Sequence, residues 1–241
     1  MRLLVSVSSA DEARAALEGG ADLIDAKDPA SGPLGAVSID TLREIVAAVG
    51  VACPVTAAIG DASSEAEVEA LAHDFAAAGV RLVKIGLAGV ADAARARALV
   101  AAAVRGARSA APGSPTADPA GVVVVAYADA LDGPSPEDVL GIATETAATG
   151  VLIDTRTKTG PGLLRLMTVE ALARWTAEAR ARGLVPMLAG RLTADDVGAL
   201  ARGVGAEIAG VRGAACEGGR TGRTSAQRVR VLRTAITHGR C

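Results

Sequence analysis

The sequence contains few aromatic residues, few histidines and few lysines, and each shortage narrows the chemistry open to the protein. Stacking against nucleobases needs aromatic side chains, but the 241 residues include only one Phe, one Tyr and one Trp. The formal net charge of −2 also argues against a broad basic surface. We therefore expect no nucleic-acid partner.

Cysteine is scarce as well. Cys53, Cys216 and Cys241 are widely separated and show neither a paired framework nor a metal-ligand spacing such as C-x-x-C. No apolar run approaches the roughly 20 residues needed to cross a bilayer, and the run at the amino terminus soon reaches Asp11 and Glu12, unlike a signal peptide. We expect a cytoplasmic protein with no metal site and no membrane partner.

Histidine, the commonest catalytic base, occurs only as His73, inside a predicted outer helix, and as His238, near the carboxyl end. Neither position suits a catalytic base. No histidine accompanies Cys216 to activate its thiol as a nucleophile. Acid and base chemistry is then left to lysine and carboxylate side chains.

Short β-branched or apolar runs alternate with longer helical patterns, which is typical of parallel strands joined by crossover helices. Eight strands are predicted, over residues 3–7, 23–27, 54–59, 82–86, 122–127, 151–154, 186–189 and 207–211. Alanine-rich helices such as 63–78 and 91–108 suit an outer ring. A doubly wound open sheet is disfavoured because no glycine-rich dinucleotide loop follows the first strand. The sequence predicts a single α/β domain, residues 1–241, folded as a (β/α)8 TIM barrel.

Only three of the 25 basic residues are lysine: Lys27, Lys84 and Lys158. All three fall at or near the carboxyl ends of predicted strands two, four and six, where alternate strands of a TIM barrel meet at the active-site face. Unlike a guanidinium, an amine can lose its proton when it is desolvated or lies beside other cations. A neutral amine can then attack a carbonyl, so the pattern predicts Schiff-base chemistry.

Carboxylates accompany these lysines. Asp25 precedes Lys27 by two positions, so both side chains point to the same face of a strand. Asp154 ends strand six and Asp129 follows strand five, where both can join the lysines; Asp129 is predicted to contact the substrate or its phosphate. Asp25 and Asp154 are suited to hold or shuttle protons. The alternative is a set of ordinary ion pairs on the barrel rim, which contribute little energy.

The loops after strands seven and eight, where barrels often bind phosphate, are rich in glycine and arginine. Glycine permits close backbone approach, and arginine gives bidentate contacts to phosphate oxygens. Four residues directly after these strands are the predicted phosphate ligands: Gly190, Arg191, Arg212 and Gly213. For the later Arg220 and Arg223, solvation or contact with another subunit is the alternative role.

These residues lie in motifs that resemble those of the (5-formylfuran-3-yl)methyl phosphate synthase family, also called 4-(hydroxymethyl)-2-furancarboxaldehyde-phosphate synthases. The resemblance spans nearly the whole chain and is carried by ADLIDAKDPASGPLGA, VKIGL, LIDTRTKTG and GVRGAAC. The first run is the most specific, because it combines Asp25 and Lys27 with Gly32, Leu34 and Gly35.

The resemblance implies a TIM-barrel lyase that condenses two molecules of glyceraldehyde 3-phosphate into (5-formylfuran-3-yl)methyl phosphate, with loss of one phosphate and water and no metal or organic cofactor. It implies that Lys27 forms the Schiff base and that Lys84 accepts a proton. Asp25, Asp154 and Lys158 would assist proton transfer and phosphate loss. The product would enter a methanofuran-type pathway or supply another furan metabolite.

Two alternatives remain open from the residues alone. A Schiff-base aldolase acting on another sugar phosphate would use the same lysine and the same phosphate loops. A non-catalytic barrel would bind a phosphorylated ligand and use its lysines only as charges. In each case the expected partner is a small phosphorylated molecule, and the apolar outer helices favour a homo-oligomer.

Overall fold

Eight parallel strands form a closed barrel in the computed structural model, which describes residues 1–110 and 119–238. The barrel closes because β1 pairs with β8 as well as with β2. The strands are β1 Arg2–Val7, β2 Leu23–Ala26, β3 Val55–Asp61, β4 Leu82–Gly86, β5 Gly121–Tyr127, β6 Gly150–Asp154, β7 Val185–Leu188 and β8 Ile208–Val211. The predicted (β/α)8 barrel is confirmed, and every predicted strand boundary lies within two residues of the observed one.

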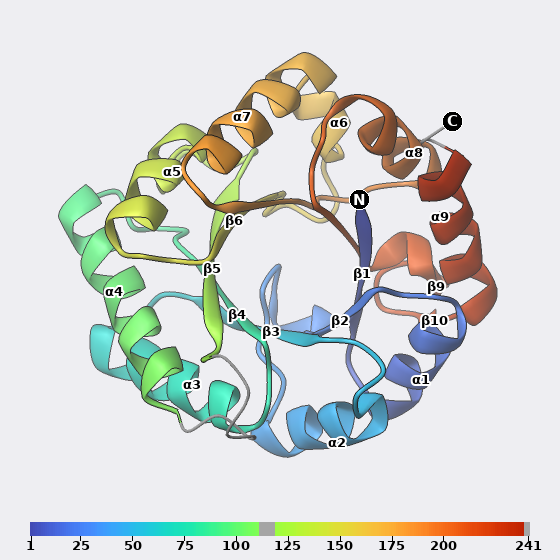
Figure 1. Ribbon diagram of the computed structural model, residues 1–241, viewed down its shortest axis with the longest axis horizontal. Coiled ribbons are helices and arrows are strands. Elements are labelled where there is room, and N and C mark those ends of the chain that lie inside the picture. Colours follow the sequence, from blue (N-terminus) through green and yellow to red (C-terminus); the bar gives the residue numbers. More distant parts are fainter. Residues whose placement is uncertain (111–118, 239–241) are drawn as a thin grey trace.

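Helices connect successive strands and form a ring outside the barrel (Figure 1). They are α1 Ala10–Glu18, α2 Ile39–Val49, α3 Glu65–Ala77, α4 Ala93–Ser109, α5 Pro136–Glu145, α6 Leu163–Leu166, α7 Val169–Ala181, α8 Ala194–Gly203 and α9 Ala226–His238. The last helix, α9, packs against both α8 and α1 and so completes the ring. No helix in the described part of the chain is long and apolar enough to cross a membrane.

Besides the loop after β6, which contains the short helix α6, two loops at the carboxyl ends of the strands carry extra structure that the simple alternation did not predict. The loop after β2 contains a short 3-10 helix, η1 Pro29–Ser31. The connection after β8 contains another, η2 Gly213–Ala215, followed by the small hairpin of β9 Cys216–Glu217 and β10 Arg223–Thr224. Both loops lie on the face where the predicted site residues lie.

Polar residues mark where the helices begin. At the starts of α1, α2, α3 and α7, a Ser or Thr side chain accepts a hydrogen bond from a backbone N–H in the first turn. Helices α5 and α8 each begin with a reciprocal capping box, formed by Ser135 with Asp138 and by Thr193 with Asp196. Such caps stabilise a helix by about 1 kcal/mol each, so the chain specifies these starts locally.

The period-two alternation of the strands separates two apolar regions. Outward-facing residues such as Val5 and Ile24 join the core between the barrel and its helices. Inward-facing residues fill the barrel itself, and they include Leu4, Leu23, Val123, Leu152 and Met187. Ser6, Asp25 and Asp154 follow Leu4, Leu23 and Leu152 by two positions on the same strand faces, so these polar residues stand nearer the mouth of the barrel.

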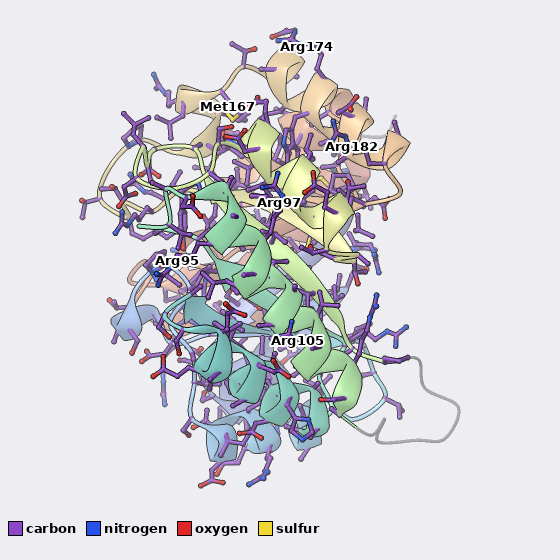
Figure 2. The ribbon with its side chains drawn as sticks, turned by 90° about the vertical axis from the view of Figure 1, so that its left-hand side faces the viewer. Arg95, Arg97, Arg105, Met167, Arg174 and Arg182 are labelled. Atoms are coloured by element: carbon purple, nitrogen blue, oxygen red, sulfur yellow. The ribbon has the colours of Figure 1, made fainter. Side chains whose placement is uncertain are left out.

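Arginines on the outer helices form ion pairs between neighbours. Figure 2 labels Arg97 and Arg105 on α4, which crosses the front of that view. Arg105 Nη2 lies 2.7 Å from Glu69 Oε2 of α3, and Arg97 pairs with Glu145 of α5. These side chains are substantially exposed, so each pair contributes at most about 1 kcal/mol. Packing between the helices therefore matters more than these charges.

We expect Gly106→Ala to destabilise the protein by about 1–3 kcal/mol, because α3 and α4 approach each other too closely for a side chain at this position. A Cβ at Gly106 would lie 2.1 Å from the Glu69 carbonyl oxygen. Gly141→Ala in α5 is the matched control: a Cβ there meets nothing within 4 Å, and the change should stabilise by up to about 1 kcal/mol. Urea unfolding measures both, and equal stabilities for the two variants would contradict the close approach.

Candidate active site

The carboxyl ends of β2, β4 and β6 bring buried charged residues together at the mouth of the barrel. Asp25, Lys84 and Asp154 are all less than 5% exposed. Each stands two positions after a leucine of the barrel interior, so the same face of each strand changes from apolar to charged near its end. Lys27 follows β2 by one residue, and its backbone N–H still donates to the Val7 carbonyl at 2.9 Å.

Asp25 is fully buried and accepts hydrogen bonds from three other strands. Lys84 Nζ lies 2.5 Å from Oδ1, and Thr56 Oγ1 donates to the same oxygen at 2.8 Å. Ser6 Oγ donates to Oδ2 at 2.8 Å. A buried charge is costly unless it is paired and hydrogen-bonded, and here the carboxylate has one cation and two hydroxyls. The Asp25–Lys84 pair is therefore rigidly held.

A second pair forms between Asp154 and Lys158. Lys158 Nζ lies 2.7 Å from Asp154 Oδ1, which also accepts from the Thr155 backbone N–H at 2.7 Å. Burial raises the pKa of Asp154, but the charges of Lys158 and Lys27, together with the hydrogen bonds, outweigh that effect and lower the pKa below its ordinary value. Asp154 is thus held as a carboxylate at neutral pH.

Lys27 differs from the other two lysines because it has no ion pair with any residue that the structure describes. Burial lowers the pKa of its amine to about 8; the charges of Asp154 and Asp25 oppose this shift, while those of Lys84 and Lys158 reinforce it. An uncharged fraction therefore exists near neutral pH. This is the condition for an amine to act as a nucleophile.

A cavity of about 330 Å³ opens above these residues. Lys27, Lys84, Asp154 and Lys158 all line it, so the structure brings the three lysines to one pocket, as the sequence predicted. The described residues contain no group of three or more His, Cys, Asp or Glu side chains that could hold a metal ion. The pocket offers the amines of three lysines and the carboxylate of Asp154, with arginine side chains elsewhere on its wall.

The loop after β2 folds back over one side of the cavity. Leu34 is 1% exposed and lines the pocket. The Asp28 backbone N–H donates to the Gly35 carbonyl at 2.9 Å, and a Cβ at Gly35 would lie 2.4 Å from the Asp28 carbonyl oxygen. Only glycine allows this approach, which gives a physical reason for the DPASGPLG motif.

The loop after β7 supplies Gly190 and Arg191 to the opposite side of the cavity. Both residues have positive φ, 111° for Gly190 and 56° for Arg191. A Cβ at Gly190 would lie 2.9 Å from Thr155 Cγ2, so the turn packs closely against the end of β6. A left-handed arginine costs free energy, and such strain is often stored at functional sites. Arg191 is exposed at the cavity rim.

Arg212 lines the cavity after β8, but its guanidinium is fully engaged within the protein. Its Nη atoms form a bidentate ion pair with Glu12, at 2.5 and 3.1 Å. The remaining three N–H groups donate to the carbonyls of Ser6, Arg220 and Gly222. All five donors are used, so Arg212 holds the loop together and has no free fork for phosphate. Gly213 borders the cavity through its backbone.

Asp129 does not line this cavity. Its two carboxylate oxygens accept from the backbone N–H groups of Arg156 and Thr157, at 2.6 and 2.8 Å. It therefore fixes the loop after β6, which carries Lys158. The predicted substrate contact at Asp129 is replaced by support for this loop, because short aspartate side chains readily satisfy nearby backbone donors.

Comparison with known proteins identifies the family. A family model described as 4-HFC-P synthase matches residues 3–233. The chain belongs to this family. It is 40% identical to a putative (5-formylfuran-3-yl)methyl phosphate synthase of Methylorubrum extorquens, over 89% of this chain and 82% of the relative. It is 34% identical to the (5-formylfuran-3-yl)methyl phosphate synthase of Methanocaldococcus jannaschii, over 97% and 98%. The 4-HFC-P synthase relatives are enzymes, and so is this protein.

Solved structures similar to this 4-HFC-P synthase family member share its fold. KGPDC from Streptococcus mutans has a TM-score of 0.64 and 16% identity, covering 98% of this chain and 97% of that one. Phosphoribosyl anthranilate isomerase from Thermotoga maritima has a TM-score of 0.66 and 13% identity, with 99% of each chain covered. At these identities the likeness concerns the barrel alone.

Several residues that support this site were not among the predicted site residues. Ser6 and Thr56, which hold Asp25, occupy inward-facing positions of the strands on either side of β2, and that parity was an available signal. Glu12 in α1 gave no comparable signal, and the composition of the loop after β8 did not distinguish Arg220 from Arg223. The positions of Glu12 and Arg220 depend on a contact between the two ends of the barrel sequence.

The lowered pKa of Lys27 predicts a distinctive reactivity toward acetic anhydride. Only the neutral amine reacts, so acetylation of Lys27 should rise with pH to a midpoint near 8, whereas an ordinary lysine reaches its midpoint above about 10. Peptide mass spectrometry after brief labelling at pH 6–10 measures the profile. A midpoint of 10 or higher would show that the amine remains hydrated.

Replacing Asp154 by Asn should move that midpoint below 8, because the Asp154 charge is the largest effect that raises the pKa of Lys27. At pH 7 the labelling of Lys27 should increase about two- to tenfold. Asp132→Asn is the control, since Asp132 pairs with Arg156 at the exposed surface, away from Lys27. An unchanged midpoint in Asp154→Asn would argue against electrostatic coupling between the two side chains.

Proposed function

We propose that this protein condenses two molecules of glyceraldehyde 3-phosphate into (5-formylfuran-3-yl)methyl phosphate through a Schiff base on Lys27. One observation carries the proposal: Lys27 is the lysine of the pocket that has no ion pair among the described residues, and burial lowers its pKa to about 8. The names of the relatives supply the product, and the motif resemblance supplies the substrate.

The covalent step begins when the neutral Nζ of Lys27 attacks the aldehyde carbon of one substrate molecule. The carbonyl oxygen takes a proton while the attacking nitrogen loses one, which gives a neutral carbinolamine. A second proton then allows its hydroxyl to leave as water, which produces the iminium. Lys158, paired with Asp154 across 2.7 Å, is suited to supply the proton.

The iminium withdraws electrons from the adjacent carbon and acidifies its proton. Lys84, which lines the cavity, is suited to accept that proton once its own proton has moved to the Asp25 carboxylate, whose Oδ1 lies 2.5 Å from Lys84 Nζ. Electrons released at this carbon can expel phosphate from its neighbour or attack the second aldehyde. Two triose phosphates become one furan phosphate, one inorganic phosphate and two molecules of water, so the reaction is a lyase reaction without an external oxidant or reductant.

Phosphate binding is assigned to the cavity wall formed by the loops after β7 and β8. Gly190 and Gly213 bring backbone close to the cavity, and Arg191 places a guanidinium at its rim. Glycine turns and arginine together suit a dianionic phosphate. The cavity volume of about 330 Å³ matches the range of small-molecule sites.

The test uses glyceraldehyde 3-phosphate alone as substrate. We expect the protein to release inorganic phosphate and to form a furan chromophore in the near ultraviolet. With borohydride present, mass spectrometry should find a reduced adduct on the peptide that contains Lys27. Reversible aldol exchange without phosphate release would instead indicate an ordinary Schiff-base aldolase, and an unchanged protein mass would exclude the Schiff base.

Lys27→Arg keeps the positive charge but removes the deprotonable amine, so we expect turnover to fall by about a thousandfold or more and the adduct to disappear. Lys158→Arg is the comparison variant, because it preserves the charge beside Asp154 and the amine at Lys27. It should still trap substrate at Lys27 while turnover slows. Trapping that persists in Lys27→Arg would place the nucleophile elsewhere.

A further inference from the structure

Arg220 occupies the cavity wall formed by the long connection after β8. Its Nη2 donates to the Gly32 carbonyl at 2.6 Å, which joins this connection to the loop after β2 across the mouth of the pocket. No carboxylate pairs with Arg220 among residues 1–110 and 119–238. Its other N–H groups are therefore available to a ligand in the cavity.

The surroundings of Arg220 favour an anion. Burial lowers the pKa of its guanidinium, an effect that the charges of Asp154 and Asp28 oppose. A half-buried cation without an ion pair is a costly arrangement, and an anionic ligand would offset the cost. Arg191 also lacks an ion pair within the described structure but is exposed to solvent, whereas Arg220 is partly desolvated inside the cavity, where a charge-assisted bond is stronger.

A buried ion pair holds Arg220 in this place. Arg212 donates from Nε to the Arg220 carbonyl and from Nη2 to the Gly222 carbonyl, at 3.0 and 3.1 Å. It is itself fixed by Glu12, whose carboxylate also accepts from the Ser8 backbone N–H at 2.7 Å. The turn between β9 and β10 is glycine-rich, with positive φ at Gly218 and Gly219, so its backbone has little stiffness of its own. The Glu12–Arg212 ion pair therefore supplies the rigidity that the glycine-rich backbone lacks.

We propose that Arg220 binds the phosphate of the substrate and that Glu12 and Arg212 are positioning residues that hold Arg220 toward the cavity. The inference deepens the proposed function and depends on it for the substrate class, a phosphorylated aldehyde. It assigns the phosphate to Arg220, whose guanidinium makes one hydrogen bond and no ion pair within the described structure, in place of the fully engaged Arg212. The Glu12–Arg212 pair acts only through the loop that it organises.

The experiment compares two aldehydes that differ only in the phosphate. Borohydride trapping at Lys27 is measured against the concentration of glyceraldehyde 3-phosphate and of glyceraldehyde, and the ratio of the half-saturating concentrations gives the phosphate preference. Arg220→Met should reduce this preference about ten- to a hundredfold, the value of a charge-assisted hydrogen bond. Trapping with unphosphorylated glyceraldehyde should stay unchanged, because Lys27 and its neighbours are intact.

Glu12→Gln tests the positioning role. The change removes the charge that fixes Arg212, so the phosphate preference should fall several-fold, less than in Arg220→Met, while trapping of glyceraldehyde is retained. General destabilisation would not alter the ratio selectively. If Glu12→Gln does not fold, Ser8→Ala removes one hydrogen bond to the same carboxylate, 3.0 Å long, and should act in the same direction.

Two control variants make the same kinds of substitution at residues that contact neither Arg212 nor the cavity. Arg223→Met removes an exposed arginine of the same loop, and Asp11→Asn removes an exposed carboxylate next to Glu12. Both should keep the wild-type preference. An Arg220→Met protein with the full preference for the phosphorylated aldehyde would overturn the inference, even if Lys27 is trapped normally.

If the proposed function is wrong, the trapping experiment gives a different result from the one that overturns the role of Arg220. If the wild-type protein traps neither aldehyde, the Schiff base is excluded, and phosphate binding is then measured directly by titration calorimetry with inorganic phosphate. Weaker binding in Arg220→Met, but not in Arg223→Met, would still support the assignment of Arg220. Equal binding in both variants would overturn it.

Discussion

The site depends on the burial of Lys27, whose side chain is largely removed from water. The inner apolar cluster closes the barrel from within, and the loops after β2 and β8 cover much of its mouth, so charges placed between them are poorly hydrated. Two of the three lysines compensate by pairing with a buried aspartate. Lys27 has no such partner in the described structure, and burial favours its neutral form.

The division of roles among the lysines follows from this arrangement. Asp25 and Asp154 are both close enough to influence Lys27, but each is committed to another amine. A cation that is stabilised only at a distance loses its proton more easily than one in a salt bridge. The same pocket therefore holds one unpaired amine and two lysine–aspartate ion pairs, built from only two residue types.

The second organising contact joins the two ends of the sequence. Glu12 in α1 and Arg212 after β8 are separated by 200 positions and meet only because β1 pairs with β8. Breaking a buried ion pair is expensive, about 3–5 kcal/mol when one partner is removed. Here such a pair organises a glycine-rich loop at the cavity rim, through the hydrogen bonds of Arg212 to the carbonyls of Arg220 and Gly222.

The sequence by itself determined the barrel, its strand boundaries and the gathering of lysines and aspartates at one face, because period-two alternation and capping residues act within a few positions. Tertiary structure alone decided which lysine stays unpaired, since pairing depends on distances between β1, β2, β3 and β4 that no local pattern contains. It also decided that Arg212 supports the loop while Arg220 faces the cavity, and that Asp129 caps backbone N–H groups. An arginine or aspartate carries the same donors or acceptors wherever it stands, and only its neighbours in space determine whether any remain free for a substrate.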